Sequence, residues 1–177
     1  SPIAELVRNY PIRSLNVVAH IRKATQGVVT LENTHPFMRE LWGRYWVFAH
    51  NGNLPQFKPH PDAGSMPVGD TDSEHMGIFN YLLSNGDCLF AHCSTELSYI
   101  ARRAPFNRAH LKDEDVMVDF SEVTTPDDRA AIIATLPLTD NEPWVTMPPG
   151  SLWMFHDGEA VAHLATKPSP IKTLSGS

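Results

Sequence analysis

The sequence predicts an α+β fold in which most of the strands pair antiparallel. Apolar runs flank Asn85-Gly86 in "IFNYLLSNGDCLFAHC" and Asp157-Gly158 in "LWMFHDGEAVAHL". Asn-Gly and Asp-Gly pairs between such runs are typical of tight hairpins, because both residues tolerate positive φ. The helical contribution comes from the first ten residues, "SPIAELVRNY", whose apolar positions recur at i, i+3, i+4 and i+7. Ser1 and Pro2 suit the cap and the first turn of this short helix.

Three further apolar runs are predicted to be strands. They are "LNVVAHIR" at 15–22, "RYWVFAH" at 44–50 and "RAAIIATLPL" at 129–138, which are rich in β-branched or aromatic residues or apolar throughout. The last run has no polar alternation, which predicts burial on both faces. Residues 54–69, with four Pro and two Gly, are expected to form one surface loop.

We expect one domain over residues 1–177, because the chain is 42% hydrophobic and contains no repeat or linker. The net charge of -6, with 14 scattered Lys and Arg residues, argues against a nucleic-acid partner. No apolar run approaches the roughly 20 residues that span a bilayer, and no leader opens the chain. These features predict a cytoplasmic protein without a membrane partner.

The cysteines and histidines do not indicate a bound metal. Cys88 and Cys93 lie five residues apart in one apolar run, so they are expected on opposite faces of a strand as buried thiols rather than as a disulfide. The nine histidines lack spacings such as H-E-x-x-H. We therefore expect no metal and no other cofactor.

The sequence pattern of a helix N-terminus occurs at residues 71–74, but no helical pattern follows it. "TDSE" is a capping box, in which Thr71 and Glu74 would satisfy each other's backbone N–H groups. A strand-like run with Gly77 follows at once, although an average helix has about 11 residues. Either a segment near His75 was lost from the protein, or the sequence joins two pieces across an intervening stretch. We prefer the second explanation.

Several polar groups are candidates for binding, each with an ordinary alternative. Arg22 follows a predicted strand and could hold a carboxylate in a two-pronged fork, or could be a solvated surface residue. Asp72 and its acidic neighbours stand at a presumed helix start, where the helix dipole favours carboxylates in any protein. Asn51-Gly52 could be only a hairpin corner, or could also direct a backbone N–H at a substrate.

Four motifs in order, "HIRKATQG", "ENTHPF", "FAHNGNL" and "GDTDSE", resemble the glutaminase domain of class II glutamine amidotransferases. These are N-terminal-nucleophile hydrolases. The likeness extends through "FNYLLSNGDCLFAHCS" and "RRAPF" and is nearest to the stand-alone bacterial YafJ-type proteins. It implies a four-layer αββα sandwich of two mainly antiparallel sheets between helical layers, incomplete in this chain.

The resemblance also implies roles for five residues. Arg22 matches the residue that binds the α-carboxylate of glutamine, Thr25 matches a neighbouring substrate contact, and Asp72 matches the acid that binds the α-ammonium group. Asn51 and Gly52 match the oxyanion hole, through the side-chain amide and the backbone N–H respectively. Glycine suits this second position, because a side chain would crowd an N–H that must approach a substrate.

The nucleophile of this family is an N-terminal Cys, which forms a γ-glutamyl thioester. Ser1 is not expected to replace it, because "SPIAELVRNYPIRS" resembles an internal stretch of the family. Cys88 and Cys93 read as ordinary buried thiols. We therefore expect the nucleophile segment to precede Ser1 and a helical segment to be missing near His75, with one common cause.

Three functional interpretations follow. The first is a glutaminase or γ-glutamyl amide hydrolase that releases ammonia or an amine. The second is a catalytically inactive relative that binds glutamine or a γ-glutamyl ligand, and the third is an unrelated structural domain. The expected partners are glutamine or another γ-glutamyl small molecule and, since stand-alone members have no synthase half, a possible separate protein that accepts the ammonia.

Overall fold

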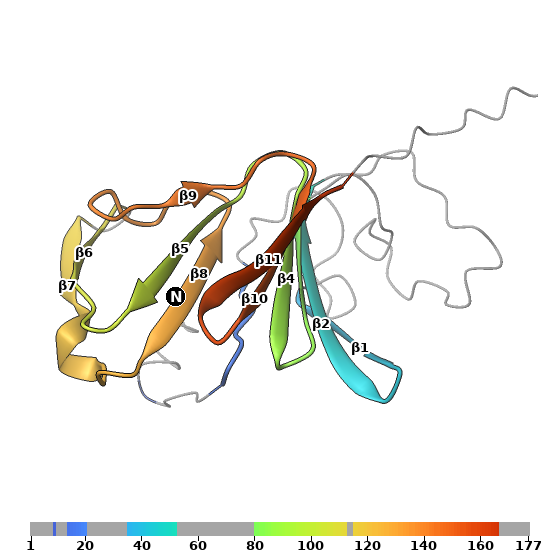
Figure 1. Ribbon diagram of the computed structural model, residues 1–177, viewed down its shortest axis with the longest axis horizontal. Helices are drawn as coiled ribbons and strands as arrows, with labels where there is room; N and C mark the ends of the chain where they lie inside the picture. The colour runs from blue at the N-terminus through green and yellow to red at the C-terminus, as the bar shows by residue number, and fades with distance from the viewer. Residues whose placement is uncertain (1–8, 10–13, 21–34, 53–79, 113–114, 167–177) are drawn as a thin grey trace, which may run out of the picture.

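Antiparallel sheets dominate the computed structural model, which describes residues 9, 14–20, 35–52, 80–112 and 115–166 (Figure 1). The strand order is β1-β2-β3-β4-β10-β11 in a six-stranded sheet, β8-β5-β9 in a three-stranded sheet and β6-β7 in a two-stranded sheet. Every strand pair within these residues is antiparallel, in line with the expected pairing. Within the described ranges no long helix occurs, so the helical layers of the expected sandwich are not confirmed.

The six-stranded sheet contains both hairpins that the sequence predicts. Gly86 joins β3 to β4 with a φ of 93°, and Asp157 and Gly158 join β10 to β11 with φ values of 49° and 71°. The strands of this sheet are β1 (Phe37–Leu41), β2 (Arg44–Asn51), β3 (Asn80–Ser84), β4 (Cys88–Cys93), β10 (Ser151–His156) and β11 (Glu159–Ala165). Asn85-Gly86 and Asp157-Gly158 therefore each lie in the tight connection between two strands that their tolerance of positive φ predicts.

A third tight turn connects β1 to β2, where the sequence predicted no hairpin. Leu41 pairs with Arg44, so Trp42 and Gly43 form a two-residue turn, with φ values of 56° and 71°. Asn51-Gly52 is not a tight turn between two paired strands among the described residues. Asn51 ends β2 and pairs with Asn80, the first residue of β3, and the next described strand begins 28 residues after Gly52.

The three-stranded sheet consists of β5 (Ser98–Arg103), β8 (Arg129–Ala134) and β9 (Val145–Thr146). The two-stranded sheet consists of β6 (Arg108–Leu111) and β7 (Val116–Asp119), and the 3-10 helix η3 (Phe120–Val123) follows it. β8 occupies the predicted apolar run but is half-buried rather than buried on both faces. Among the described strands it pairs only with β5, which leaves its other edge without a strand.

The predicted strand at 15–22 is not a strand over residues 15–20, and its last two residues lie outside the described part of the chain. Leu15 and Val17 are largely exposed. Val18 packs against the core, and the Asn16 amide donates to the Gly86 carbonyl at 2.5 Å. β-branched residues favour strands through packing against cross-strand neighbours, and this segment has no strand partner among the described residues.

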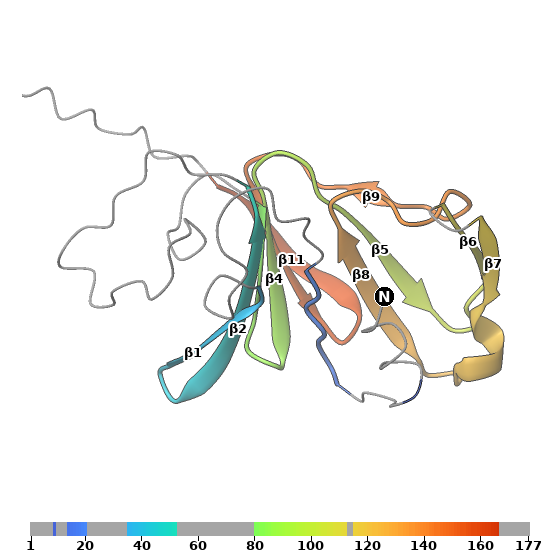
Figure 2. The same ribbon diagram turned by 180° about the vertical axis from the view of Figure 1, so that it is seen from behind.

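The core lies between the six-stranded and three-stranded sheets, which are seen side by side from opposite directions in Figures 1 and 2. The Tyr99 ring of β5 lies 5.1 Å from that of Trp153 and 5.2 Å from that of Phe155, both on β10. Buried residues of β4 and two residues that flank β5 and β9 complete this cluster: Leu89, Ala91, Cys93, Leu97 and Met147. Among the described residues no helix is both long and apolar enough to cross a membrane.

Candidate functional site

A cavity of about 530 Å³ opens where strand ends of the two larger sheets meet. β2 and β3 contribute residues from the six-stranded sheet, and the ends of β8 and β9 contribute residues from the three-stranded sheet. The lining residues are Asn51, Gly52, Asn80, Thr95, Glu96, Thr135, Thr146, Met147 and Pro149. Asn51 and Gly52, which the family resemblance matches to the oxyanion hole, therefore both line this cavity.

Asn51 faces the cavity because of its register in β2. Side chains alternate along a strand, so Asn51 lies on the same face as Ala49, which is buried in the core. The Asn51 Nδ2 donates to the Thr135 Oγ1 at 3.4 Å, across to the end of β8. Gly52 follows directly at the strand end.

Asn80 fixes the neighbouring wall of the cavity. Its buried side chain donates to the Thr95 Oγ1 at 2.9 Å and to the Glu96 carbonyl at 3.0 Å. Its Oδ1 accepts from the backbone N–H groups of Ser94 at 2.9 Å and Thr95 at 3.1 Å. The amide thus uses both donors and both acceptor sites, which holds the turn after β4 in one conformation. The sequence does not reveal this role, because the partners of Asn80 lie 14 to 16 residues away.

The base of the cavity is tied to the core through Met147. This side chain is fully buried, and the Met147 N–H donates to the Leu97 carbonyl at 2.8 Å. The Cys93 Sγ donates to the Met147 carbonyl at 3.4 Å. These contacts fix this part of the cavity lining to the end of β4 and to the segment before β5.

Cys93 is a buried structural thiol, as predicted. Desolvation raises the pKa of this thiol, which disfavours the thiolate needed for nucleophilic attack. Cys88 lies on the opposite face of β4, where it is half-buried rather than buried, and both cysteines are free. Cys93 therefore does not provide a nucleophile for this cavity.

The described lining of the cavity has one ionisable side chain, Glu96, and its other polar groups are uncharged amides, hydroxyls and backbone atoms. Amide and backbone N–H donors in such surroundings can stabilise a negative oxygen that develops during a reaction. The three residues expected to hold the glutamine head group, Arg22, Thr25 and Asp72, lie outside the described residues.

Three histidines that the sequence did not indicate come together near the end of β2, where His50 lies on the face opposite to Asn51. The His35 ring lies 4.4 Å from the His20 ring and 4.6 Å from the His50 ring, edge to face in both pairs. Each histidine belongs to a different motif: "AHIR", "THPF" and "AHNG". The ring contacts bring residues 20 and 35 together with the end of β2, and no local pattern in the sequence indicated this cluster.

Comparisons with known proteins identify the family. The family model described as "Glutamine amidotransferases class-II" matches residues 1–76 and 75–175. "Putative glutamine amidotransferase" of Haemophilus influenzae is 43% identical over 203 residues, which cover 95% of this chain and 69% of that protein. "Putative glutamine amidotransferase YafJ" of Escherichia coli is 46% identical over 197 residues, which cover 91% of this chain and 77% of that protein. Both alignments are longer than the 177 residues of this chain, so each relative has residues without a counterpart here.

A solved structure agrees with these sequence relatives. The crystal structure of a predicted glutamine amidotransferase from Pseudomonas aeruginosa has a TM-score of 0.68 and 46% sequence identity. The similarity covers 81% of this chain and 70% of that chain. The resemblance on which the sequence analysis relied is confirmed, and an unrelated structural domain is excluded. The chain belongs to the class II glutamine amidotransferase family.

Proposed function

We propose that this chain is the glutaminase of a class II amidotransferase-type amide hydrolase. Its substrate is glutamine or a related γ-glutamyl compound, and its products are a γ-glutamyl acid and ammonia or an amine. The observation that carries the proposal is the position of Asn51 and Gly52, side by side on the wall of the cavity between the two sheets. Membership of the family supports the same reaction.

The chemistry requires a thiol nucleophile, which we expect upstream of Ser1. The thiolate attacks the γ-carbonyl carbon, and the π electrons of the carbonyl move to its oxygen. The Asn51 amide and the Gly52 N–H donate to this oxyanion. The free α-amine of the same Cys takes up the thiol proton and passes it to the nitrogen, so that the tetrahedral intermediate expels ammonia or an amine. Water then hydrolyses the γ-glutamyl thioester to the γ-glutamyl acid and the thiol.

The substrate head group is assigned to three residues by the family resemblance. In this proposal Arg22 holds the α-carboxylate in a two-pronged interaction, with Thr25 beside it, and Asp72 holds the α-ammonium group. Opposite charges at the two ends of the zwitterion would leave the side-chain amide pointing at the nucleophile. Such positioning makes the reaction effectively intramolecular.

The N-terminus of the native protein tests the enzyme proposal most directly. Intact mass and N-terminal sequencing should find a Cys, exposed after removal of Met, upstream of the present Ser1. Ammonia release from glutamine should then depend on that Cys and should fall about 100- to 1000-fold in Asn51→Ala. A mature protein that begins at Ser1 would instead leave a catalytically inactive binding relative as the interpretation.

Calorimetric titration with glutamine tests the head-group assignment separately. Arg22→Ala and Asp72→Ala should each weaken binding, because each removes one charged partner of the zwitterion. Asn51→Ala is the matched control and should keep its affinity, because oxyanion donors act on charge that develops only in the transition state. Unchanged binding in both charge variants would show that the head group is held elsewhere.

A further inference from the structure

Thr135 is the hydrogen-bond partner of the proposed oxyanion donor. It lies one residue beyond the end of β8, and its Oγ1 accepts from the Asn51 Nδ2 at 3.4 Å. We propose that Thr135 is a positioning residue that holds the Asn51 amide with one N–H directed at the reacting carbonyl oxygen. This inference rests on the proposed function and adds a residue to its machinery.

The Asn51 amide needs such a partner because little else among the described residues holds it in one orientation. Asn51 is exposed and is the last residue of β2. The terminal torsion of an Asn side chain has broad minima, so packing is needed to select one orientation. Within the described part of the chain, the Thr135 hydroxyl is the only hydrogen-bond partner of this amide. Asn80, directly opposite in the register, differs in that four hydrogen bonds fix its amide.

The geometry divides the two N–H groups of Nδ2 between two tasks. One N–H is directed at Thr135, and the other is then available to the cavity that both residues line. A separation of 3.4 Å is long for a hydrogen bond, but such bonds in unliganded active sites often tighten when the substrate complex forms. A donor that is already oriented costs no reorganisation when negative charge develops on the oxygen.

This contact also joins the two larger sheets at the mouth of the cavity. Asn51 ends a strand of the six-stranded sheet, and Thr135 follows a strand of the three-stranded sheet. The orientation of the donor therefore depends on how the sheets pack, rather than on the "HNGN" segment alone.

Steady-state kinetics of ammonia release by the full native protein test the proposal. Thr135→Val removes the hydroxyl at nearly constant volume and should lower kcat about 10- to 100-fold, with KM within about twofold of wild type. Thr135→Ser keeps the hydroxyl and should retain most of the activity. The matched control is Thr124→Val, which removes a half-buried hydroxyl that donates to the Phe120 carbonyl at 2.9 Å, away from the cavity.

A double-mutant cycle separates positioning from a general structural effect. If Thr135 acts through Asn51, Thr135→Val should cost nothing further once Asn51→Ala is present. An equal loss of kcat in both backgrounds would overturn the proposal. So would wild-type kinetics in Thr135→Val. Thr135→Ala serves the same comparison if the valine variant does not fold.

NMR of the Asn51 side chain tests the positioning role of Thr135 without relying on enzyme activity, so it can fail or succeed independently of the proposed function. If the wild-type protein releases no ammonia, the proposed function fails, while the NMR signals of the Asn51 side-chain NH₂ group still report its orientation. Thr135→Val should move these signals toward those of a free amide, and Thr135→Ser and Thr124→Val should leave them in place. Unchanged Asn51 signals in Thr135→Val would contradict the positioning role.

Discussion

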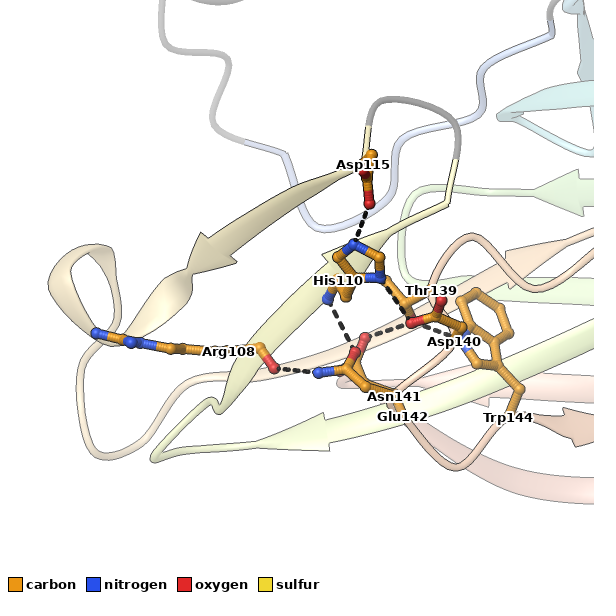
Figure 3. Close-up of polar contacts among 8 residues, drawn as sticks. All are labelled: Arg108, His110, Asp115, Thr139, Asp140, Asn141, Glu142 and Trp144. Carbon is orange, nitrogen blue, oxygen red and sulfur yellow. Dashed lines mark hydrogen bonds and ion pairs between the residues drawn. The ribbon is translucent and has the colours of Figure 1, made fainter.

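At the scale of single residues, His110 shows how carboxylates can set the charge of an imidazole. Its Nδ1 lies 2.9 Å from the Asp140 Oδ1, and its Nε2 lies 2.9 Å from the Asp115 Oδ1 (Figure 3). Hydrogen bonds to Asp140 and then to Asp115 raise the pKa of His110 above its ordinary value of 6.5. The protonated ring therefore ties the β6–β7 turn to the loop that carries Asp140.

The raised pKa of His110 predicts a pH-dependent contribution to stability. The folded state binds the proton more tightly than the unfolded state, so the contribution is complete below about pH 6.5 and is lost as the pH rises through the folded pKa. We expect the difference in urea midpoint between wild type and His110→Asn to be largest at pH 5.5 to 6 and to shrink above neutrality. His156→Asn, at the exposed end of β10, is the control. A difference that grows with pH would contradict this assignment.

Only some residues of the candidate site could be recognised from the sequence. Asn51 and Gly52 stand in a motif and both line the cavity, while their role as oxyanion donors stays a prediction. Thr135 and Asn80 were missed, because a hydroxyl 84 positions from its partner, or an amide that anchors a distant turn, has no local signature. The contacts that orient side chains are long-range, whereas motifs are short.

At the scale of elements, the β10–β11 hairpin depends on its glycine for two reasons. Gly158 has a φ of 71°, and a Cβ there would lie 2.7 Å from the Ala130 nitrogen and the Arg129 carbonyl carbon. The hairpin tip therefore packs directly against the backbone of β8. Gly86 in the β3–β4 turn has a φ of 93°, but a Cβ there would meet open space.

These two glycines form a matched pair for mutation. Gly86→Ala should destabilise the fold by about 1 to 2 kcal/mol, which is the cost of a left-handed conformation for a residue with a Cβ. Gly158→Ala should cost clearly more, because the clash with β8 adds to that conformational strain. Denaturant midpoints of both variants measure the difference. Equal costs would show that the close approach of the hairpin to β8 is not maintained in solution.

Elements determined by local turn residues could be predicted from the sequence. Elements determined by distant strands that pair with them could not. The Asn-Gly and Asp-Gly hairpins were correct, because the turn residues determine the connection. β1 was missed because Trp42 is not a typical turn residue, and 15–20 was wrongly predicted as a strand because β-propensity depends on neighbours. The order of strands in each sheet is set by long-range pairing, so no local pattern indicated it.

At the scale of the whole molecule, one buried ion pair links the three-stranded sheet to the surrounding loops. Arg102 on β5 donates to both Glu142 carboxylate oxygens, at 2.8 and 2.5 Å, and each side chain is about one-tenth exposed. The same carboxylate accepts from the Thr139 Oγ1 at 2.7 Å, and the Arg102 guanidinium lies 4.8 Å from the centre of the Phe120 ring. The pair thus joins β5, the loop at 139–144 and η3.

Breaking this pair should affect the global stability. Glu142→Ala leaves a buried guanidinium without its partner and should cost about 3 to 5 kcal/mol. Asp87→Ala is the control, because the Arg44–Asp87 pair is mostly exposed and such pairs contribute about 0 to 1 kcal/mol. Chemical denaturation of the two variants under the same conditions gives both values. Similar losses would mean that the burial of Arg102 and Glu142 is not retained in solution.

The direct pairing of β2 with β3 has a consequence for how chain length can vary in this family. Asn51 and Asn80 are opposite each other in the sheet, so any stretch inserted after Gly52 leaves and re-enters at adjacent strand ends. Loop-closure cost grows slowly, by about 0.6 kcal/mol for each doubling of length. Segments can therefore be gained or lost in this connection while Asn51 keeps its place in the sheet. The length of the connection after Gly52 can therefore change without moving the strand residues that line the cavity.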